Sequence, residues 1–539
     1  MEVKEKLKIN IQYALKKIGI DLAIEQIDID NSRDLSHGDY ASNVALKNAK
    51  SVGKAPRDFA NLIVQELDMD EIEKVEIAGP GFINFFIKKN SITSVVSKIL
   101  EQEDDYGRGE KKNFKINVEF VSANPTGLLH VGTARGAAIG DSISRILQFS
   151  GYDVTKEYYI NDAGVQIAHL GESIVERYKE LLGLPFKLPE DGYHGEDVAQ
   201  IAKELKDEFG DNLLSREDCL QFFMEKGMQI ELDRIKKHLA DFRVTFDVFS
   251  SEKSIRSNGA IEKELEFLKP YTYVDNGGTY LKTTKFLDDK DRVIVKSNGD
   301  YTYFMPDIVY HVNKMSRGFD KLIDVLGADH HGYINRMKSA LMMHGYNAES
   351  LDIELIQMVR FIKDGKEFKA SKRAGDAITL HEICEEVGVD AMRYFFAMRA
   401  HSTHMDFDMD LAKEQSSNNP VYYAQYAHAR LCSILSTASD IEIDKNATYL
   451  AQNSELSLVK QLSLFPDIVI SAANEKAPYK ITNYIHDLAE KVHAFYTECR
   501  VIDRDNIAIT SSRLALCKAS KIVLKNALQL IGVSSPNRM

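Results

Sequence analysis

The sequence predicts a multidomain α/β protein built around a largely parallel sheet, with a smaller α/β domain before it and an all-helical domain after it. Three observations support this prediction. Strand-like and helix-like runs alternate from residue 114 onward, as in sheets whose strands are joined by helices. The polar stretch "EQEDDYGRGEKKN" separates this part from a first α/β unit, and strand patterns cease near residue 412. We therefore expect three domains, over residues 1–108, 109–411 and 412–539.

The composition is that of a globular protein, with 44% hydrophobic and 28% charged residues. The formal net charge of -13 argues against a uniformly basic surface but leaves room for a local basic groove that binds nucleic acid. The five cysteines are scattered without a CxxC pair, which indicates reduced thiols rather than a disulfide framework or a structural zinc site. No apolar run approaches the roughly 18 residues of a membrane span, and the first residues lack a signal-peptide core, so we expect no membrane partner and a cytoplasmic location.

The first domain is predicted to contain three helices and two strands. Helical spacing of apolar residues predicts helices over about 3–18, the second half of 31–50 and about 56–67. The alternating run "KVEIAG", a "GPG" turn and the run "FINFFI" predict two strands joined by a tight turn.

The middle domain begins with the strand "KINVEFV" and a helix near 134–149, followed by the strand "DVTKEYYI" and a helix over about 163–182. Charged, helix-rich sequence over about 195–270 is predicted to be an insertion between two halves of the sheet. Strand-like runs then return as "TYLKTT", "RVIVK", "YTYFMPDIVYHV", "KLIDVLG" and "LDIELIQMVRFI". In an open parallel sheet, ligands bind at the carboxyl ends of the strands, where the strand order reverses.

Four long amphipathic segments after residue 412 predict an all-helical third domain. Several of its aromatic side chains are of the kind that stack on unpaired bases, although at helical spacing such side chains more often belong to the core. These are Tyr422, Tyr423, Tyr426, Tyr484, Phe495 and Tyr496.

The stretch "SANPTGLLHVGTARG", residues 122–136, joins the first strand of the middle domain to its helix. Pro125, Gly127 and Gly132 allow a tight turn and a close approach of the backbone to a ligand. The free N–H groups of the following helix favour an anion, and His130 offers a donor for a phosphate or ribose oxygen. The patterns GxGxxG after a strand and GxxxxGK[ST] are absent, and an ordinary strand–loop–helix turn would show the same local features.

A lysine-rich loop, "FIKDGKEFKASKRAGDAITL", follows the last strand-like run. A charge run of this kind is usually a solvated surface. Here Ser371 and small residues are interleaved with the cations, so Lys369 and Lys372 are candidates to offset the charge of a pyrophosphate leaving group.

These two stretches carry a resemblance to a known class of enzymes. "HVGT" resembles the HIGH motif and "KASK" the KMSK motif of class I aminoacyl-tRNA synthetases, whose catalytic domain is Rossmann-like. Within that class the sequence resembles the arginyl-tRNA synthetases in "VEFVSANPTGLLHVG", "YYINDAGVQI", "GADHHGYINR", "SKRAG", "EVGVDAMRYFFAMR" and "IGVSSPNRM". "GDYASNVAL" and "GPGFINFFI" resemble the additional N-terminal domain of that family, which contacts the D-loop of tRNA. The resemblance therefore covers all three domains.

The resemblance implies which residues bind arginine. Tyr303 and Asp307, in "YFMPD", match the family residues that bind the guanidinium group, a planar donor suited to carboxylate and hydroxyl acceptors. Asn124 and Ser122 are implied to hold the α-amino and carboxylate groups of the substrate, while Glu119 supplies negative charge near the amine.

The residues implied for ATP binding and catalysis lie in the two motifs and in "GADHHG". ATP is expected to contact Pro125, Gly127, His130, Gly132, Asp329, His330 and His331. Those implied in catalysis are His130, Gly132, Thr133, Lys369, Ser371 and Lys372. The paired histidines lack a third ligand at useful spacing, so no protein metal site is predicted, and Mg²⁺ is expected to accompany ATP.

The implied reaction attaches arginine to tRNA in two steps. The carboxylate of L-arginine attacks the α-phosphorus of ATP, which releases pyrophosphate and leaves arginyl adenylate. The 2′-hydroxyl of the terminal tRNA adenosine then attacks the activated carbonyl. Arginine tRNA is expected to contact the protein through its D-loop, acceptor end and anticodon, the last on the helical domain. In this family activation usually requires bound tRNA, and we expect a monomer.

Two positions depart from the family pattern. Thr133 stands where a second histidine is usual, and Val165 stands where "NDAGNQI" would have asparagine. Threonine keeps a hydroxyl donor but is never cationic, and some glutamyl-tRNA synthetases use similar HxGT sequences, so the change is compatible with activity. Two other functions stay open on the sequence: a paralogue that activates arginine for another acceptor, and a tRNA-binding protein without catalysis.

Overall fold

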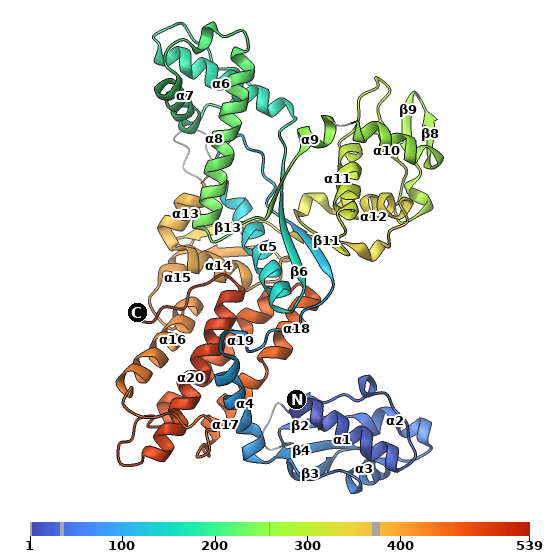
Figure 1. Cartoon of the computed structure of the whole chain (residues 1–539), viewed down its shortest axis with the longest axis vertical. Coiled ribbons are helices and arrows are strands. Elements are labelled where there is room, and N and C mark those ends of the chain that lie inside the picture. Colours follow the sequence, from blue (N-terminus) through green and yellow to red (C-terminus); the bar gives the residue numbers. More distant parts are fainter. Residues whose placement is uncertain (1–2, 33–36, 258, 369–377) are drawn as a thin grey trace.

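A parallel sheet of five strands lies at the centre of the protein (Figure 1), in a computed structural model that describes residues 3–32, 37–257, 259–368 and 378–539. The strand order is β12-β11-β5-β6-β7, with every neighbouring pair parallel. This sheet confirms the predicted fold class. The strands are β5 (Lys115–Glu119), β6 (Asp153–Ile160), β7 (Val248–Ser251), β11 (Lys321–Gly327) and β12 (Leu351–Ile356).

The order of the strands places a switch point between β5 and β11. From β5 the chain proceeds outward to β6 and β7, and it returns to the other side of β5 only at β11. Helices leaving the carboxyl ends of β5 and β11 therefore diverge to opposite sides, which opens a crevice for ligands between them.

The helix α5 (Val131–Phe149) follows β5 and runs through the interior of the protein. Small residues line it, and a Cβ atom at Gly140 would lie 2.3 Å from the side chain of Phe120, so the helix packs closely on the end of β5. Further helices of this domain are α6 (Val165–Leu181), α11 (Phe304–Ser316), α12 (Ile334–Met343), α13 (Leu380–Val387), α14 (Val389–Ala397) and α15 (Met409–Lys413).

One strand-like run of the sequence is a helix in the structure. "YTYFMPDIVYHV" forms the start of α11, and its apolar residues Met305, Ile308 and Val309 are buried at helical spacing. Pro306 lies in the first turn, where proline costs no hydrogen bond. A short run of apolar and aromatic residues does not distinguish a buried helix from a strand by periodicity, which explains the wrong expectation.

Two other strand-like runs and half of a third lie outside the parallel sheet. "TYLKTT" and "RVIVK" belong to a separate antiparallel sheet of order β10-β9-β8. "LDIELIQMVRFI" breaks after β12, and its second half forms β13, which pairs with β15 in a small third sheet. The strands concerned are β8 (Thr272–Asp275), β9 (Gly278–Leu281), β10 (Arg292–Val295), β13 (Val359–Lys363), β14 (Lys366–Glu367) and β15 (Met405–Asp408).

The segment expected as a helical insertion over about 195–270 divides into two parts. Its first part forms α7 (Glu196–Phe209) and α8 (Cys219–Asp241), which project with α6 at the upper end of Figure 1. The chain then returns to the central sheet as β7, which pairs with β6. The expected helix-rich insertion did not include this strand. The remainder forms α9 (Glu252–Ser257) and α10 (Ala260–Leu268), which pack on α11.

The N-terminal unit combines three helices with a four-stranded antiparallel sheet of order β1-β2-β4-β3. Leu7, Ile11 and Leu15 lie on one face of the first helix and are buried against the sheet, as the helical spacing of apolar residues predicts. Its elements are α1 (Val3–Lys17), β1 (Asp30–Asn31), β2 (Tyr40–Ser42), α2 (Val44–Val52), α3 (Pro56–Gln65), β3 (Ile72–Ala78) and β4 (Phe82–Ile87), followed by α4 (Lys89–Gln102).

The last part of the chain is entirely helical and lies below the central sheet in Figure 1. Proline stands at the start of three of its helices, where its fixed φ angle suits the first turn. The helices are α16 (Pro420–Thr437), α17 (Asn453–Ser463), α18 (Phe465–Glu475), α19 (Pro478–Glu498) and α20 (Ile507–Leu530). Their apolar faces and those of α5, α13 and α14 form one continuous core.

One stretch of this helical part, Asn453–Glu475, is long and apolar enough by composition to cross a membrane. It consists of two helices, α17 and α18, and Leu458, Leu462, Phe465 and Val469 are fully buried in the core. Their apolar character is therefore explained by packing inside the helical domain.

Candidate active site

The turn between β5 and α5 has a strained backbone. Val121 and Ser122, which follow β5, have φ angles of +69° and +44°, a region that non-glycine residues rarely adopt unless the surroundings impose it. The hydroxyl group of Ser122 donates to Glu119 Oε1 at 3.0 Å and accepts the backbone N–H of Tyr159 at 3.1 Å. These bonds tie the turn to the ends of β5 and β6, beside the switch point.

His130 is the N-cap of α5, and its hydrogen bond defines the position of its proton. Nδ1 accepts the backbone N–H of Gly132 at 2.8 Å, and burial lowers the pKa of the imidazole. The neutral ring therefore carries its proton on Nε2, which can donate to a ligand. A Cβ atom at Gly132 would lie 2.8 Å from His130 Nδ1, so glycine is required beside the ring.

Thr133 directs its hydroxyl proton into the protein. Its Oγ1 donates to the carbonyl oxygen of His130 at 2.6 Å, within the first turn of α5. Threonine keeps a hydroxyl donor, as expected, but this donor satisfies a backbone group of its own helix.

A cavity of about 820 Å³ lies between the start of α5 and the carboxyl ends of β11 and β12. His130, Gly132 and Thr133 form one wall, and Gly327 and Asp329 form another. The rest of the lining is mixed: Ile356, Met358, Val359, Phe361, Phe368 and Ile378 are apolar, and Gln357, Arg360, Glu367 and His404 are polar or charged. The backbone N–H groups of Val131, Gly132 and Thr133 already donate within the protein, so His130 Nε2 is the donor that the start of α5 offers to this cavity. A ring donor beside apolar side chains suits a nucleotide, whose phosphates need donors and whose base needs an apolar surface.

A second cavity, of about 410 Å³, adjoins the first, and Leu326 lines both. Tyr303 and Asp307 both line this second cavity. The structure therefore places both members of the predicted pair beside the larger cavity. Tyr303 lies at the start of α11 and is 85% exposed, whereas Asp307 lies one turn further into the helix.

The carboxylate of Asp307 is surrounded by aromatic rings. Tyr159, Tyr310 and Tyr333 line the same cavity, and the hydroxyl group of Tyr333 donates to Asp307. Burial raises the pKa of Asp307 to about 6, since an apolar environment disfavours the charged form. A ligand that brings positive charge to this position would restore the ionised carboxylate.

A buried ionic network lies beside the second cavity. Lys314 is completely buried and binds Glu119 and Asp324, the latter at 2.9 Å, and His311 Nε2 lies 2.7 Å from Asp324 Oδ2. Burial would lower the pKa of Lys314, but Asp324 and Glu119 outweigh it and raise that pKa. Burial would likewise raise the pKa of Asp324, but Lys314 and His311 hold it well below its usual range. Among the described residues, Asp307 is thus left as the cavity carboxylate without an ion pair.

The residues of "GADHHG" separate in space. Asp329 lines the larger cavity, His330 lines the smaller one, and the exposed His331 is part of neither lining. The three residues lie along a short turn between the two cavities, and their contacts with ATP stay a prediction.

The other predicted residues lie around the cavities. Asn124 donates through its amide group to Gln166 at the start of α6, while Pro125 is buried in the turn. Gly127 lies further along that turn, where an added Cβ atom would meet only Asp197. The predicted catalytic residues Lys369, Ser371 and Lys372 lie outside the residues that the structure describes.

The predicted set omits the side chains that surround Asp307, namely Tyr159, Tyr310, His311, Lys314, Asp324 and Tyr333. Three of them follow Asp307 on α11 at helical spacing, so a signal was present in the sequence. The prediction of a strand for "YTYFMPDIVYHV" hides this helical spacing, because alternate residues of a strand point to opposite faces.

No group of three His, Cys, Asp or Glu side chains suited to hold a metal ion occurs within residues 3–32, 37–257, 259–368 and 378–539.

A third cavity, of about 780 Å³, lies on the surface of the helical domain. Its lining combines an aromatic ring with positive charge and includes Tyr426, Arg430, Lys521, Arg538 and Met539. The rings of Tyr422 and Tyr426 stack with centroids 6.2 Å apart, and Arg430 lies 4.2 Å from the ring centre of Tyr496.

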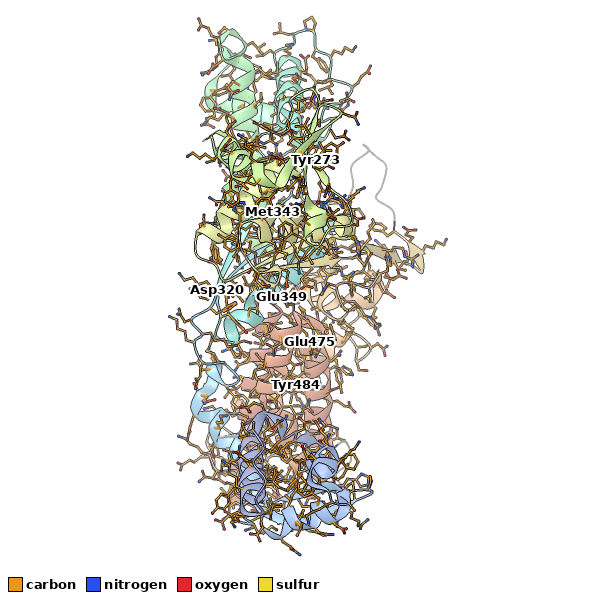
Figure 2. The ribbon with its side chains drawn as sticks, turned by 90° about the vertical axis from the view of Figure 1, so that its right-hand side faces the viewer. Tyr273, Asp320, Met343, Glu349, Glu475 and Tyr484 are labelled. Carbon is orange, nitrogen blue, oxygen red and sulfur yellow. The ribbon has the colours of Figure 1, made fainter. Side chains whose placement is uncertain are left out.

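Two of the aromatic residues considered for base stacking belong to the core. Tyr484, labelled among the helices in Figure 2, is 2% exposed, and Phe495 is 1% exposed. Tyr426 and Tyr496 are each 39% exposed; Tyr426 lines the third cavity, and Tyr496 contacts Arg430 of that lining.

Three protein families match successive parts of the chain. Residues 5–87 match the arginyl tRNA synthetase N terminal domain, residues 95–432 match the catalytic domain of tRNA synthetases class I (R), and residues 424–539 match the DALR anticodon binding domain.

Whole-chain relatives agree with these matches. The arginine–tRNA ligases of Geobacillus kaustophilus and Bacillus subtilis are 50% and 48% identical to this chain, over 100% of this chain and 99% of each relative. The solved arginyl-tRNA synthetase of Thermus thermophilus has the same fold, with a TM-score of 0.75 at 22% identity over 100% of both chains. The chain therefore belongs to the arginyl-tRNA synthetases, a family of class I aminoacyl-tRNA synthetases.

Proposed function

We propose that this protein attaches L-arginine to its cognate tRNA through an arginyl-adenylate intermediate, at the expense of ATP. The observation that carries the proposal is the position of Asp307, an unpaired carboxylate among aromatic rings in a cavity that adjoins a nucleotide-sized cavity. A cationic amino acid in the cavity of Asp307 and a nucleotide in the larger cavity would meet where the two cavities share Leu326.

The guanidinium group of arginine binds at Asp307 in this proposal. A carboxylate accepts two parallel N–H bonds from the planar group, and Tyr159, Tyr310 and Tyr333 offer rings against its faces. Lysine is rejected because its ammonium group is a point charge that cannot satisfy the same acceptors in the same geometry. Tyr303, at the exposed end of the cavity, adds a hydroxyl acceptor.

The α-amino and carboxylate groups of arginine face the turn after β5. Glu119 lines the cavity and offers negative charge, although it shares that charge with Lys314. Ser122 and Asn124 remain the proposed partners of these substrate groups, since both belong to the turn that β5 presents to the switch point.

ATP occupies the larger cavity as its Mg²⁺ complex, with the phosphates at the start of α5. The Nε2 proton of His130 donates to a phosphate oxygen, with the positive end of the α5 dipole beside it, and Asp329 and His330 are proposed to contact the ribose. The metal is held chiefly by phosphate oxygens and water, as is usual for Mg²⁺ with nucleotides.

Adenylate formation proceeds by in-line attack of the arginine carboxylate on the α-phosphorus. Charge grows on the leaving pyrophosphate, and His130 stabilises it from one side. Lys369, Ser371 and Lys372 are proposed to do so from the other. The 2′-hydroxyl of the terminal adenosine of tRNA then attacks the activated carbonyl and displaces AMP.

The tRNA extends over the other two domains in this proposal. The N-terminal unit contacts the D-loop, the helical domain contacts the anticodon, and the acceptor end reaches the two cavities of the catalytic domain. The third cavity supplies the combination that single-stranded bases require, an exposed aromatic ring at Tyr426 with Arg430, Lys521 and Arg538 around it. A monomer acting in the cytoplasm, where tRNA is charged, is the expected form.

The test is charging of an arginine tRNA transcript with labelled arginine, with lysine and citrulline as competing substrates. We expect charging with arginine, and charging with either analogue reduced by a factor of about 100 or more, because each leaves acceptors of the cavity unpaired. ATP–pyrophosphate exchange is expected to require the tRNA. Absence of arginine charging above background with the cognate transcript would contradict the proposed function.

A further inference from the structure

We propose that Arg393 and the segment 531–539 couple the basic cavity of the helical domain to α5, the helix that carries His130 at its start. This inference rests on the proposed function, because it concerns how tRNA bound at that cavity affects turnover. In this proposal Arg393 is a positioning residue and contacts none of the three substrates.

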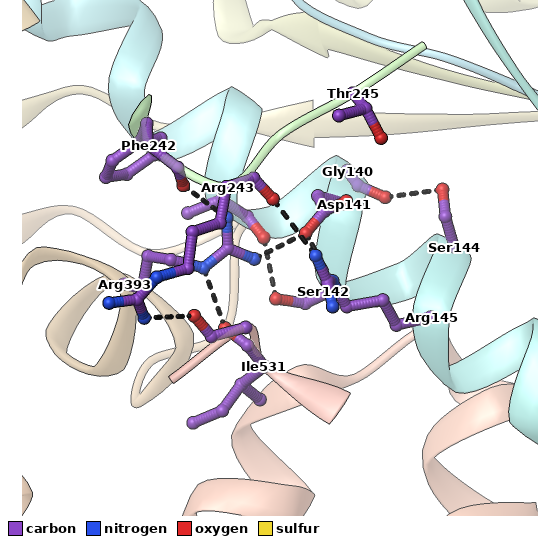
Figure 3. Close-up of polar contacts among 12 residues, drawn as sticks. Gly140, Asp141, Ser142, Ser144, Arg145, Phe242, Arg243, Thr245, Arg393 and Ile531 are labelled. Atoms are coloured by element: carbon purple, nitrogen blue, oxygen red, sulfur yellow. Dashed lines mark hydrogen bonds and ion pairs between the residues drawn. The ribbon is translucent and has the colours of Figure 1, made fainter. Parts of the chain in front are cut away.

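The side chain of Arg393, on α14, joins three separate parts of the chain (Figure 3). It is completely buried, and its Nη2 binds Asp141 Oδ2 of α5 at 2.6 Å. Nη1 donates to the carbonyl oxygen of Phe242, directly after α8, at 3.0 Å. Nε donates to the carbonyl oxygen of Ile531, directly after α20, at 2.9 Å. One guanidinium group therefore links the active-site helix to the end of the last helix.

Asp141 is anchored in α5 by further charges. Its carboxylate, which is fully buried, also binds Arg145 at 2.6 Å and Lys156 at 3.4 Å. Along an α-helix, Asp141 lies about 16 Å from His130. Because α5 is buried along most of its length, a displacement at Asp141 passes along the helix as a rigid body rather than being absorbed locally.

A second link holds the segment at the residues after Ile531. Arg243 donates to the carbonyl oxygen of Gly532 at 2.9 Å and also binds Asp390, one turn before Arg393 on α14. The backbone N–H of Ser534 donates to Asp390 Oδ1 at 2.8 Å. The carbonyl oxygen of Arg243 accepts a bond from Arg145 of α5 at 3.0 Å, so this link also reaches α5.

From there the segment follows one face of α16. Side chains about one turn apart on that helix each bind a successive part of the segment. Gln425 Nε2 donates to Ser534 O at 2.9 Å, His428 Nδ1 lies 3.0 Å from Pro536 O, and Cys432 Sγ lies 3.4 Å from Asn537 Oδ1.

The segment ends in the basic cavity. Asn537, Arg538 and Met539 line it, opposite Tyr426 and Lys521. A nucleic acid in this cavity therefore contacts residues that belong to the same short segment as Ile531 and Gly532.

Close packing around Arg393 couples movement of the segment 531–539 to movement of the Arg393 side chain. A Cβ atom at Gly532 would lie 2.3 Å from the Arg393 guanidinium, so the segment cannot shift there without moving Arg393. Packed interfaces of this kind switch between discrete arrangements instead of deforming continuously. Contact of tRNA with residues 537–539 thereby biases the position of α5 and of the His130 ring.

The test variant is Gly532→Ala, and Gly183→Ala is its matched control. Gly532 has a φ angle of +67° and meets Arg393, whereas Gly183 has a φ angle of +70° and nothing within 4 Å of an added Cβ atom. Both substitutions introduce the same backbone strain, but only the first disturbs the contact with Arg393. Each full-length variant is assayed for kcat and KM of arginine charging, with the cognate transcript and with a transcript substituted in the anticodon.

In the parent protein and in Gly183→Ala, we expect the anticodon substitution to lower kcat as well as to raise KM for tRNA. In Gly532→Ala, kcat with saturating cognate tRNA falls by about tenfold, and the anticodon substitution then lowers kcat by less than about threefold, because the coupling is already lost. The two changes are therefore not multiplicative in kcat.

Two results would overturn the inference: an effect of Gly532→Ala on KM alone, or fold-changes in kcat that multiply. An anticodon substitution that changes only KM in the parent protein would overturn it as well. If Gly532→Ala does not fold, Ser534→Ala takes its place, since it removes an exposed hydroxyl donor to Asp390 and should give the same non-multiplicative pattern with a smaller amplitude. A parent protein that charges no tRNA at all would refute the proposed function instead, so the two failures are distinguishable.

Discussion

Asp307 and Lys314 lie about two turns apart on the same face of α11, yet the Lys314 ammonium group binds Glu119 and Asp324 and leaves Asp307 without a cation. Two neighbouring strands supply the competing carboxylates, Glu119 at the end of β5 and Asp324 in the middle of β11. The protein thus neutralises part of the cavity and keeps one carboxylate for the substrate. This arrangement has consequences for pH dependence and for stability.

Arginine affinity is expected to fall in mildly acidic solution. The pKa of Asp307 in the free protein is raised to about 6, so protonation below that pH removes the charge that the guanidinium group requires. The dissociation constant for arginine should rise about tenfold between pH 7 and pH 5. Calorimetric titration across this range measures it, with Asp307→Asn as the control that binds weakly at every pH. A dissociation constant that does not change over this range would contradict the assignment.

Asp307→Asn is expected to stabilise the protein while it abolishes arginine charging. A carboxyl group whose pKa is raised on folding binds protons more tightly in the folded state, so the stability it contributes falls as pH rises from about 4 to about 6. Above pH 6 the ionised group costs up to about 3 kcal/mol of unfolding free energy. Denaturation of the variant should therefore show a higher midpoint at pH 7.5, with the gain disappearing below about pH 4. Asp329→Asn, at an exposed carboxylate, serves as control and should show no such gain.

Gly132→Ala is expected to impair adenylate formation through His130. The added Cβ atom would lie 2.8 Å from Nδ1 and would displace the ring from its hydrogen bond with the backbone. We expect kcat of tRNA-dependent ATP–pyrophosphate exchange to fall by a factor of about 10 to 100, less than the factor of about 100 to 1000 typical for complete loss of one oriented donor, because the ring is displaced and not removed. Gly136→Ala in the same helix places its Cβ atom with nothing within 4 Å and should lose far less activity. Equal losses in the two variants would argue against a role for the ring position.

Thr133 is expected to tolerate loss of its hydroxyl group. The hydroxyl proton is directed to His130 O, so Thr133→Val removes a bond inside the first turn and no donor to phosphate. We expect kcat to change by less than about threefold, in line with one neutral intrahelical hydrogen bond. Thr133→His should preserve or raise turnover, because it adds a donor facing the larger cavity. A loss of activity in Thr133→Val comparable to that of His130→Ala would show that the hydroxyl contacts the substrate.

Short sequence patterns predict many of the helices and turns, because neighbouring residues specify those elements. The glycines and proline of residues 122–136 require a turn between a strand and a helix, and the structure has β5 and α5 on either side of it. The helices of the last domain follow from apolar spacing and from proline at their starts. By contrast, the start of α11 was expected as a strand, because a short apolar run has the same appearance in either state and only its packing against α10 and α12 selects the helix.

The sequence by itself determined the family, the order of the domains along the chain and the one-turn spacing of Tyr303 and Asp307, because these depend on residue types at short spacing. Only the tertiary structure decided which carboxylate of the cavity stays unpaired and which backbone carbonyls Arg393 holds. The partners of Lys314 come from β5 and β11, and those of Arg393 from α5, the end of α8 and the end of α20. The physical reason is that burial and ion pairing depend on groups that folding brings together from distant positions in the chain. The spacing of residues along the sequence does not give the distances between such groups in the folded protein.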